Sequence, residues 1–156
     1  MEKEFEGIIN ELKKNVNIKN EIDITCSCLW GGNSWNIIEY EDESSYFYTS
    51  NFENSWICIE FRKHRIIPTS YTIRSSNDYH PQSWVIEGSV DKENWEILSE
   101  EKDSKVFSRQ SIVHSFPIQN QSQHEVKFIR LRQTGKNSNN SHHLYFSAIE
   151  FYGRLI

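Results

Sequence analysis

The sequence predicts an all-β domain, an antiparallel jelly-roll β-sandwich preceded by a short N-terminal helix. Aromatic residues make up 13% of the chain, with five Trp, seven Tyr and nine Phe. Such large rings bury enough area to build a core from few apolar positions. Ile, Thr and aromatic residues favour strands, whereas Met, a good helix former, occurs once. After residue 21 the chain consists of short strand-like runs separated by turn residues, without helical periods.

The 156 residues fit one domain, which we divide into a helix and lead-in at 1–20 and a sandwich at 21–156. Apolar residues recur at helical spacing near the start, at Phe5, Ile8, Ile9, Leu12 and Val16. Lys13 and Lys14 suit the carboxyl end of this helix. The pattern leaves open whether the helix packs on its own sandwich or joins another domain. An uncovered apolar stripe would favour dimerisation.

Eight strands are predicted, and their number and spacing favour a sandwich or jelly roll. They are Ile22–Cys28, Ser55–Phe61, Ile66–Arg74, Ser83–Val90, Trp95–Ser99, Ile112–Ile118, Val126–Arg132 and Tyr145–Tyr152. Pro68 requires an edge or a bulge because proline cannot donate to a central ladder. We expect the Ile149 and Phe151 pair to close the sandwich beside the first strand.

Two connections are unusually long, Leu29–Asn54 and Lys136–His143. Long loops on a compact β-scaffold are where binding usually resides. The first holds Tyr46, Phe47 and Tyr48, which cannot all face solvent without cost. We therefore expect part of it to fold back as a lid over one end of the sandwich.

The formal net charge of −5 argues against nucleic acid as a partner, since binding to phosphate backbones relies on Lys and Arg. No apolar run approaches the roughly 18–20 residues that span a bilayer. The start of the chain lacks the apolar stretch of a secretory signal, so a cytoplasmic location is expected. An odd number of cysteines then indicates reduced thiols, and we expect Cys26, Cys28 and Cys58 to be buried on strands.

No catalytic motif is present. The sequence has no phosphate-cradling glycine-rich loop, no zinc-protease helix motif and no nucleophile elbow. The six histidines are scattered, and none is paired with a nucleophile by spacing. The chain is therefore predicted to be a non-enzyme.

Three segments carry a resemblance to a known family: SWICIEFRKHRIIPTSYTIRSSNDYHPQSWVIEGSVDKENWEIL, then VKFIRLRQTG, then AIEFYG. Together they resemble discoidin, or coagulation-factor type C, domains of the galactose-binding-like fold. The resemblance covers about Glu21 to Gly153. It is closest to the intracellular branch that accompanies BTB domains, and more distant from the DOC subunit of the anaphase-promoting complex.

The resemblance implies a ligand site at one end of the sandwich, on the loops after the first strand, after the Thr-Ile-Arg strand and after the Gln-Thr-Gly segment. On this chain those loops hold Trp30, Asn33, Trp35, Arg74, Asn77, Asp78, Tyr79, His80, Lys136, Asn137, Asn140, His142 and His143. Arg, Asn and His beside aromatic rings can bind sugar hydroxyls, stack on a sugar face or grip a peptide carboxylate. The same residues could also serve the loops themselves, for example through an Arg74–Asp78 pair.

Many sugar-binding relatives hold a structural Ca²⁺ in the loop after the first strand, with carboxylate and carbonyl oxygens as ligands. Here that loop reads NIIEYEDESSYFYTS instead of their Asp-Gly-rich run. Glu150 matches the family's C-terminal acidic position, and Asp42 is the other candidate ligand. The departure in the loop argues against calcium, and no cofactor is predicted.

Two functions from different classes follow. The first is an intracellular module that recruits a protein or peptide partner, within a BTB-type or ubiquitin-ligase scaffold. The alternative is a lectin for galactose-type glycans. Convergence of Arg74, His80 and a tryptophan ring in one shallow cleft would favour the lectin. A flat apolar patch around Trp30, Trp35 and Tyr79 would favour a protein partner.

Overall fold

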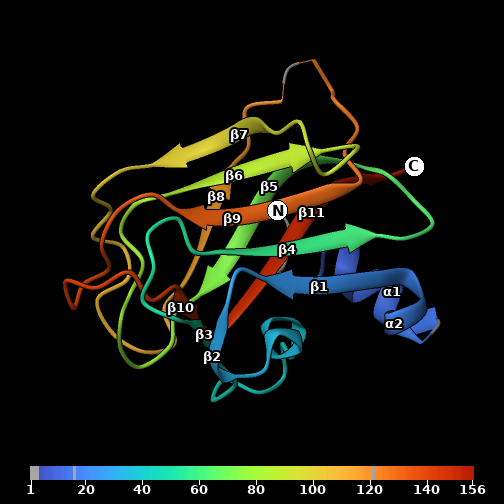
Figure 1. The fold of residues 1–156 in the computed structure, drawn as a ribbon. Coiled ribbons are helices and arrows are strands. Elements are labelled where there is room, and N and C mark those ends of the chain that lie inside the picture. Colours follow the sequence, from blue (N-terminus) through green and yellow to red (C-terminus); the bar gives the residue numbers. More distant parts are fainter. Residues whose placement is uncertain (1–3, 16, 121) are drawn as a thin grey trace.

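The protein is a mostly β sandwich with a short helix at its N-terminal side (Figure 1), as the sequence predicts. The computed structural model describes residues 4–15, 17–120 and 122–156. Its helical elements are α1 (Ile8–Asn15), α2 (Ile18–Glu21) and the 3-10 helix η1 (Ser34–Ile38). Its strands are β1 (Ile22–Cys26), β2 (Leu29–Gly32), β3 (Phe47–Thr49), β4 (Trp56–Phe61), β5 (Ile66–Arg74), β6 (Trp84–Ser89), β7 (Glu96–Glu101), β8 (Val113–Pro117), β9 (Phe128–Gln133), β10 (Tyr145–Phe146) and β11 (Ala148–Leu155).

The strands form antiparallel sheets that enclose one core. One layer is the five-stranded sheet β1-β4-β9-β6-β7, and behind it cross the strands of the sheet β11-β5-β8 (Figure 1). The small sheet β10-β3-β2 lies at one end. Alternation along β4 turns Ile57, Ile59 and Phe61 into the core, while Trp56 and Glu60 are only half-buried.

The prediction for the last strands was wrong in two respects. The run Tyr145–Tyr152 is not one strand, because the chain breaks at Ser147 between β10 and β11. In addition, β11 does not lie beside the first strand: it pairs with β5, where Ile149 faces Ile73. The register of this pair shifts at Gly153, opposite Pro68, so the proline is accommodated at a bulge as predicted.

The loop predicted at Leu29–Asn54 contains β2, η1 and β3. Periodicity missed these strands because they are only three or four residues long. Phe47 on β3 is fully buried and stacks edge-on against Phe146 at 5.0 Å. The expected fold-back of this segment over one end therefore takes the form of a small sheet.

The N-terminal helix packs on its own sandwich. The side chains of Phe5, Ile8, Ile9 and Leu12 join the main hydrophobic core, and α1 contacts β11. Val16, the last residue of the predicted stripe, lies outside the described residues. Because the described part of the stripe is covered, it gives no support to dimerisation through this face.

Glu150 fastens the helix to the sheet. Its carboxylate lies at the start of α1 and accepts hydrogen bonds from the backbone N–H groups of Gly7 (3.2 Å), Ile9 (3.0 Å) and Asn10 (2.8 Å). It also accepts one from its neighbour Phe151 (2.8 Å). A carboxylate at this position satisfies N–H groups that have no partner within the helix and complements the helix dipole. The Cβ of any residue replacing Gly7 would lie 2.8 Å from the Glu150 side chain, so the close approach requires glycine.

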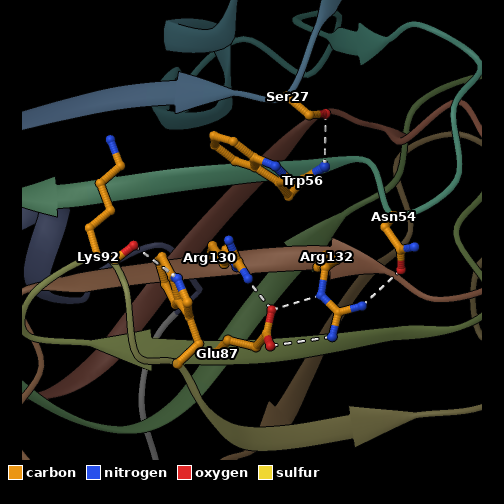
Figure 2. A network of polar contacts seen from close by, with 8 residues as sticks. Ser27, Asn54, Trp56, Glu87, Lys92, Arg130 and Arg132 are labelled. Carbon is orange, nitrogen blue, oxygen red and sulfur yellow. Dashed lines mark hydrogen bonds and ion pairs between the residues drawn. The ribbon is translucent and has the colours of Figure 1, made fainter.

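The outer face of the five-stranded sheet is covered by its own long side chains (Figure 2). Glu87 on β6 accepts hydrogen bonds from Arg130 and Arg132 on β9, both at 2.9 Å. The Arg130 guanidinium lies over the Trp95 ring at 3.8 Å and near Trp56 at 5.9 Å. Burial opposes ionisation of Glu87, but the hydrogen bonds from the two arginines lower its pKa below the ordinary value. The charged side chains of this network are thus paired with one another.

We expect the stability of the fold to fall as pH rises through the range in which Glu150 ionises. Burial raises the pKa of Glu150 from 4.5 to about 7, although four backbone N–H bonds act to lower it. Because the folded state holds this proton more tightly than the unfolded chain, the stabilisation is complete below pH 4.5 and lost as pH rises to about 7. Relative to Glu150→Gln, which does not titrate, the wild-type should lose on the order of 3 kcal/mol.

Urea unfolding of both proteins at pH 5 and pH 7.5 measures this difference. A wild-type chain that gains stability over Glu150→Gln between these two pH values would contradict the prediction. It would mean that the N–H bonds, and not burial, dominate the ionisation of Glu150.

Candidate functional site

Three loops meet at the end of the sandwich where the small sheet lies. The backbone N–H of His80, after β5, donates to the Ser138 Oγ in the loop after β9 (2.9 Å), and the Ser138 N–H donates to the His80 carbonyl (2.9 Å). The N–H of His142 in turn donates to Asn51 Oδ1 at 2.7 Å. Two of the three loops predicted to form the ligand site, those after β5 and β9, are therefore joined to each other, and the turn at 50–54 is joined to them.

Asn137 builds the loop after β9 instead of presenting itself to a ligand. It is only 3% exposed. Its Nδ2 donates to Ser141 Oγ and to the His143 carbonyl, both at 2.9 Å, while its Oδ1 accepts from the Asn139 and Ser141 N–H groups. Asn137 thereby fixes the conformation of the predicted Lys136–His143 loop.

A stack of tyrosine rings forms the floor of this end. Tyr48 on β3 and Tyr145 on β10 lie parallel with centroids 4.7 Å apart, and Tyr79 stacks on Tyr145 at 5.6 Å. The His143 ring meets Tyr48 and Tyr79 edge-on at 5.8 and 5.4 Å. Gly31 on β2 permits the stack, since a Cβ there would lie 2.3 Å from the Tyr48 ring. Such packing holds His143 in one orientation.

Beside this floor is a hollow of about 380 Å³ lined by Trp30, Ser50, Asn51, Phe52 and His143, which we call the aromatic hollow. Trp30 is 69% exposed and Phe52 is 66% exposed. Because two open aromatic rings line one hollow, it is the candidate binding surface at this end of the sandwich. None of the five lining residues is Asp, Glu, Lys or Arg, so the hollow suits an uncharged apolar group.

The histidine gives the aromatic hollow a defined polar group. His143 Nδ1 lies 2.7 Å from the Thr49 carbonyl oxygen, which can only accept. Nδ1 therefore carries a proton, and in the neutral ring Nε2 is an acceptor. Asn51 uses its Oδ1 on His142, which leaves the amide N–H₂ to donate. The hollow thus combines two open rings with one acceptor and one donor.

Arg74 does not line the aromatic hollow. The side chain was predicted to contact a ligand, but Arg74 is 2% exposed. Its guanidinium donates to the carbonyls of Tyr40 (2.9 Å), Asp42 (2.8 Å) and Glu39 (3.3 Å), and to Ser147 Oγ (2.9 Å). It forms no pair with Asp78 in the described structure; instead it anchors the long loop after β2.

The other predicted site residues are either used within the fold or left half-buried or exposed near the loops that meet. Asn33 caps η1 through a bond from the Trp35 N–H (2.9 Å), and the Trp35 ring is half-buried under Lys19, so neither lines the aromatic hollow. His80 is 7% exposed, and burial lowers its pKa. Near the loops that meet, the half-buried or exposed members are Asn77, Asp78, Tyr79, Lys136, Asn140 and His142.

Of the predicted set, only Trp30 and His143 line the aromatic hollow. Ser50, Asn51 and Phe52 lie at the end of the predicted long connection Leu29–Asn54, but the site residues were taken from its start. One signal was available: Phe52 is an apolar ring among polar loop residues, with Asn51 before it and Glu53 after it.

The two carboxylates considered for calcium have other roles. Asp42 accepts from the Ser44 Oγ (2.6 Å) and N–H (3.0 Å), and these bonds lower its pKa. Glu150 caps α1. Within residues 4–15, 17–120 and 122–156 there is no group of three His, Cys, Asp or Glu side chains that could hold a metal ion.

The chain matches no family model. It is 30% identical over 126 residues to the E3 ubiquitin-protein ligase Ufd4 of Drosophila melanogaster, covering 77% of this chain, and 29% identical over 113 residues to the E3 ubiquitin-protein ligase hecd-1 of Caenorhabditis elegans, covering 70%. The chain spans only 5% and 4% of the length of these relatives. No helix of the described residues is long and apolar enough to cross a membrane.

Solved structures share the fold. The CBM32-3 module of a family 31 glycoside hydrolase from Clostridium perfringens superposes with a TM-score of 0.67 over 86% of this chain and 92% of that one, at 13% identity. The family 32 module of C. perfringens NanJ, solved in complex with galactose, gives 0.62 over 85% and 94%, at 10% identity. At these identities the likeness establishes the galactose-binding-like fold that discoidin domains share.

We expect Arg74→Ala to destabilise the fold rather than to remove a binding contact. The substitution leaves three backbone carbonyls without a donor, which should cost on the order of 3 kcal/mol or more. Thermal unfolding measures the loss, and amide exchange should show faster opening of residues 39–47. Arg74→Lys should be almost as damaging, because one ammonium group cannot replace four separate donors. A variant with wild-type stability would show that the anchor is dispensable.

We expect the three thiols to react at very different rates. The structure corrects the view that all are buried: β1 ends at Cys26, which is half-buried, and Cys28 is exposed beside Ser50, whereas Cys58 is 2% exposed. Burial raises the pKa of Cys58 to about 12, so its reactive thiolate is scarce. A disulfide reagent followed by mass mapping should label Cys28 first and Cys58 only in denaturant. Early labelling of Cys58 would contradict this arrangement.

Proposed function

We propose that the chain is a non-catalytic intracellular module that recruits a protein or peptide partner through the aromatic hollow. The observation that carries this proposal is the open pair of Trp30 and Phe52 around His143, with no charged side chain in the lining. Exposed aromatic anchors next to a few polar groups are typical of the energetic centres of protein interfaces.

The placement of Arg74 and His80 supports a protein partner over a sugar. Recognition of several sugar hydroxyls by these residues would need their polar atoms at the surface. Arg74 is committed to the long loop and His80 is buried. What is left is a largely apolar hollow, which better fits an apolar side chain of a peptide.

The animal relatives support a ubiquitin-ligase context for this module. Both are E3 ubiquitin-protein ligases, and the match extends over most of this chain. Of the two scaffolds that the resemblance implies, a BTB-type protein and a ubiquitin ligase, these relatives favour the second. A domain of this kind would contribute partner choice, with catalysis carried by another part of the ligase.

A glycan-binding role is the second candidate, and one observation favours it. Trp30 offers a flat ring beside the donor of Asn51 and the acceptor of His143, a combination that can stack on a sugar face and bind a hydroxyl. Solved neighbours include carbohydrate-binding modules in complex with galactose and with GalNAc-β-1,3-galactose.

We expect loss of either ring to weaken recognition strongly. Trp30→Ser or Phe52→Ser should weaken partner binding about 30-fold, the effect of removing an interface anchor. The experiment is affinity capture from cell lysate with quantification by mass spectrometry, run in parallel with a glycan array. Ile97→Ser is the matched control, since Ile97 is equally open (56%) but lies on β7.

The outcomes separate the two functions. Proteins captured by the wild-type and the control, but lost with both ring variants, would support the interaction module. A selective glycan signal lost with the same variants would support the lectin and overturn the leading proposal. Partners retained by both ring variants would place recognition elsewhere on the domain.

A further inference from the structure

A second hollow lies at the opposite end of the sandwich. It measures about 350 Å³ and is lined by Arg62, Lys63, His64, Arg65, Lys127 and Ile156, which we call the basic hollow. Strand β4 runs between the two sites, from the turn at 50–54 to the turn at 62–65 (Figure 1). Five of the six lining residues are basic, although the whole chain carries 22 acidic and only 17 Lys and Arg residues.

The turn that supplies these side chains is held at both ends. The Arg62 N–H donates to the Glu21 carbonyl (2.8 Å), and the Arg65 carbonyl accepts from the Ile156 N–H (2.8 Å). Ile66, the next residue, exchanges both backbone bonds with Val126 at 2.9 Å. The basic groups are therefore presented by an ordered turn, which lowers the entropy lost when a partner binds.

Carboxylates near this turn neutralise the basic hollow only in part. Lys63 pairs with the buried Glu21 at 3.3 Å, so its charge is already used within the fold. Arg62 lies 3.8 Å from Asp23, and Lys127 lies 3.6 Å from Glu60. Pairs at such distances, whose side chains stay 30–46% exposed, contribute little energy, so a partner's carboxylate can capture these two cations. No described carboxylate pairs with Arg65, which is exposed.

We propose that the basic hollow binds an acidic peptide segment. Its cations are spread over a turn and the start of β9 instead of converging on one point, so it fits several carboxylates spaced along an extended chain. Nucleic acid fits less well, because a duplex presents a charge about every 1.7 Å of its axis and would also meet Glu21, Asp23 and Glu60. This inference does not depend on the aromatic hollow.

The test uses fluorescence anisotropy with a fluorescein-labelled decapeptide of alternating Glu and Ser. At 50 mM NaCl it should bind saturably, and Arg65→Glu should weaken binding about fivefold or more, as should 300 mM NaCl. Arg109→Glu is the matched control, since it makes the same charge change in the loop bonded to Ser75 beyond the far end of β5. Trp30→Ser should bind the peptide like the wild-type.

Four results would overturn the proposal. One is no saturation by the Glu peptide below about 1 mM, which is weaker than a usable interaction. Another is equal binding of a Gln-Ser peptide of the same length, and the third is equal loss with Arg65→Glu and Arg109→Glu. A duplex oligonucleotide that displaces the peptide and binds more tightly would assign the hollow to nucleic acid instead. Lys127→Gln removes a second positive charge from the basic hollow. Melting curves for every variant show whether a loss of peptide binding comes from the lost charge or from a lost fold.

Discussion

The hydrogen bonds of the buried Arg74 guanidinium are the interaction on which the end of the molecule with the proposed site depends. From the end of β5 it binds three carbonyls of the segment 39–42 and the hydroxyl of Ser147, and it lies 5.3 Å from the centre of the Phe5 ring. One cation on β5 therefore links three segments that are distant in sequence: residue 5, residues 39–42 and residue 147. Because Ser147 separates β10 from β11, the same contact fixes where the small sheet begins. The tyrosine floor and the aromatic hollow are built on that sheet, so their geometry follows from a residue that touches neither.

A second buried charge ties the helix to the same framework. Glu150 on β11 faces the start of α1, while Arg74 is paired with Ala148 two residues earlier on that strand. Both groups satisfy backbone atoms rather than each other: the carboxylate accepts N–H groups, and the guanidinium donates to carbonyls. An unpartnered buried charge would be costly; the carbonyl dipoles compensate the guanidinium, whereas the N–H bonds offset the burial of Glu150 only in part, so its pKa stays raised. Arg74 and Glu150, which the family resemblance suggested for a ligand and a metal, thus serve the architecture of this chain.

The sequence predicted the scaffold well because the scaffold depends on local alternation. The run Ile66–Arg74 was found with its true bounds, and of the edge or bulge expected at Pro68 the structure has the bulge. The pairing of β11 with β5 was missed, since partner choice in a sheet depends on long-range packing that a single strand's pattern does not contain. The ligand site was harder to predict than the scaffold. Residue type suggested that Arg74 and His80 contact a ligand. Whether a polar side chain reaches solvent, however, depends on which carbonyls the fold brings within its reach.

The two hollows give the module distinct chemistry at its two ends. One offers open rings with a single acceptor and donor, and the other offers cations on an ordered turn. Strand β4 joins them, and its neighbours β1 and β9 pair with it along their lengths, so the ends are held apart by a stiff sheet. A single extended partner that carried an apolar residue and an acidic run could engage both only if it spanned this strand. Two separate partners could bind at once, because neither hollow shares a lining residue with the other. The two proposed sites are thus independent in position as well as in chemistry.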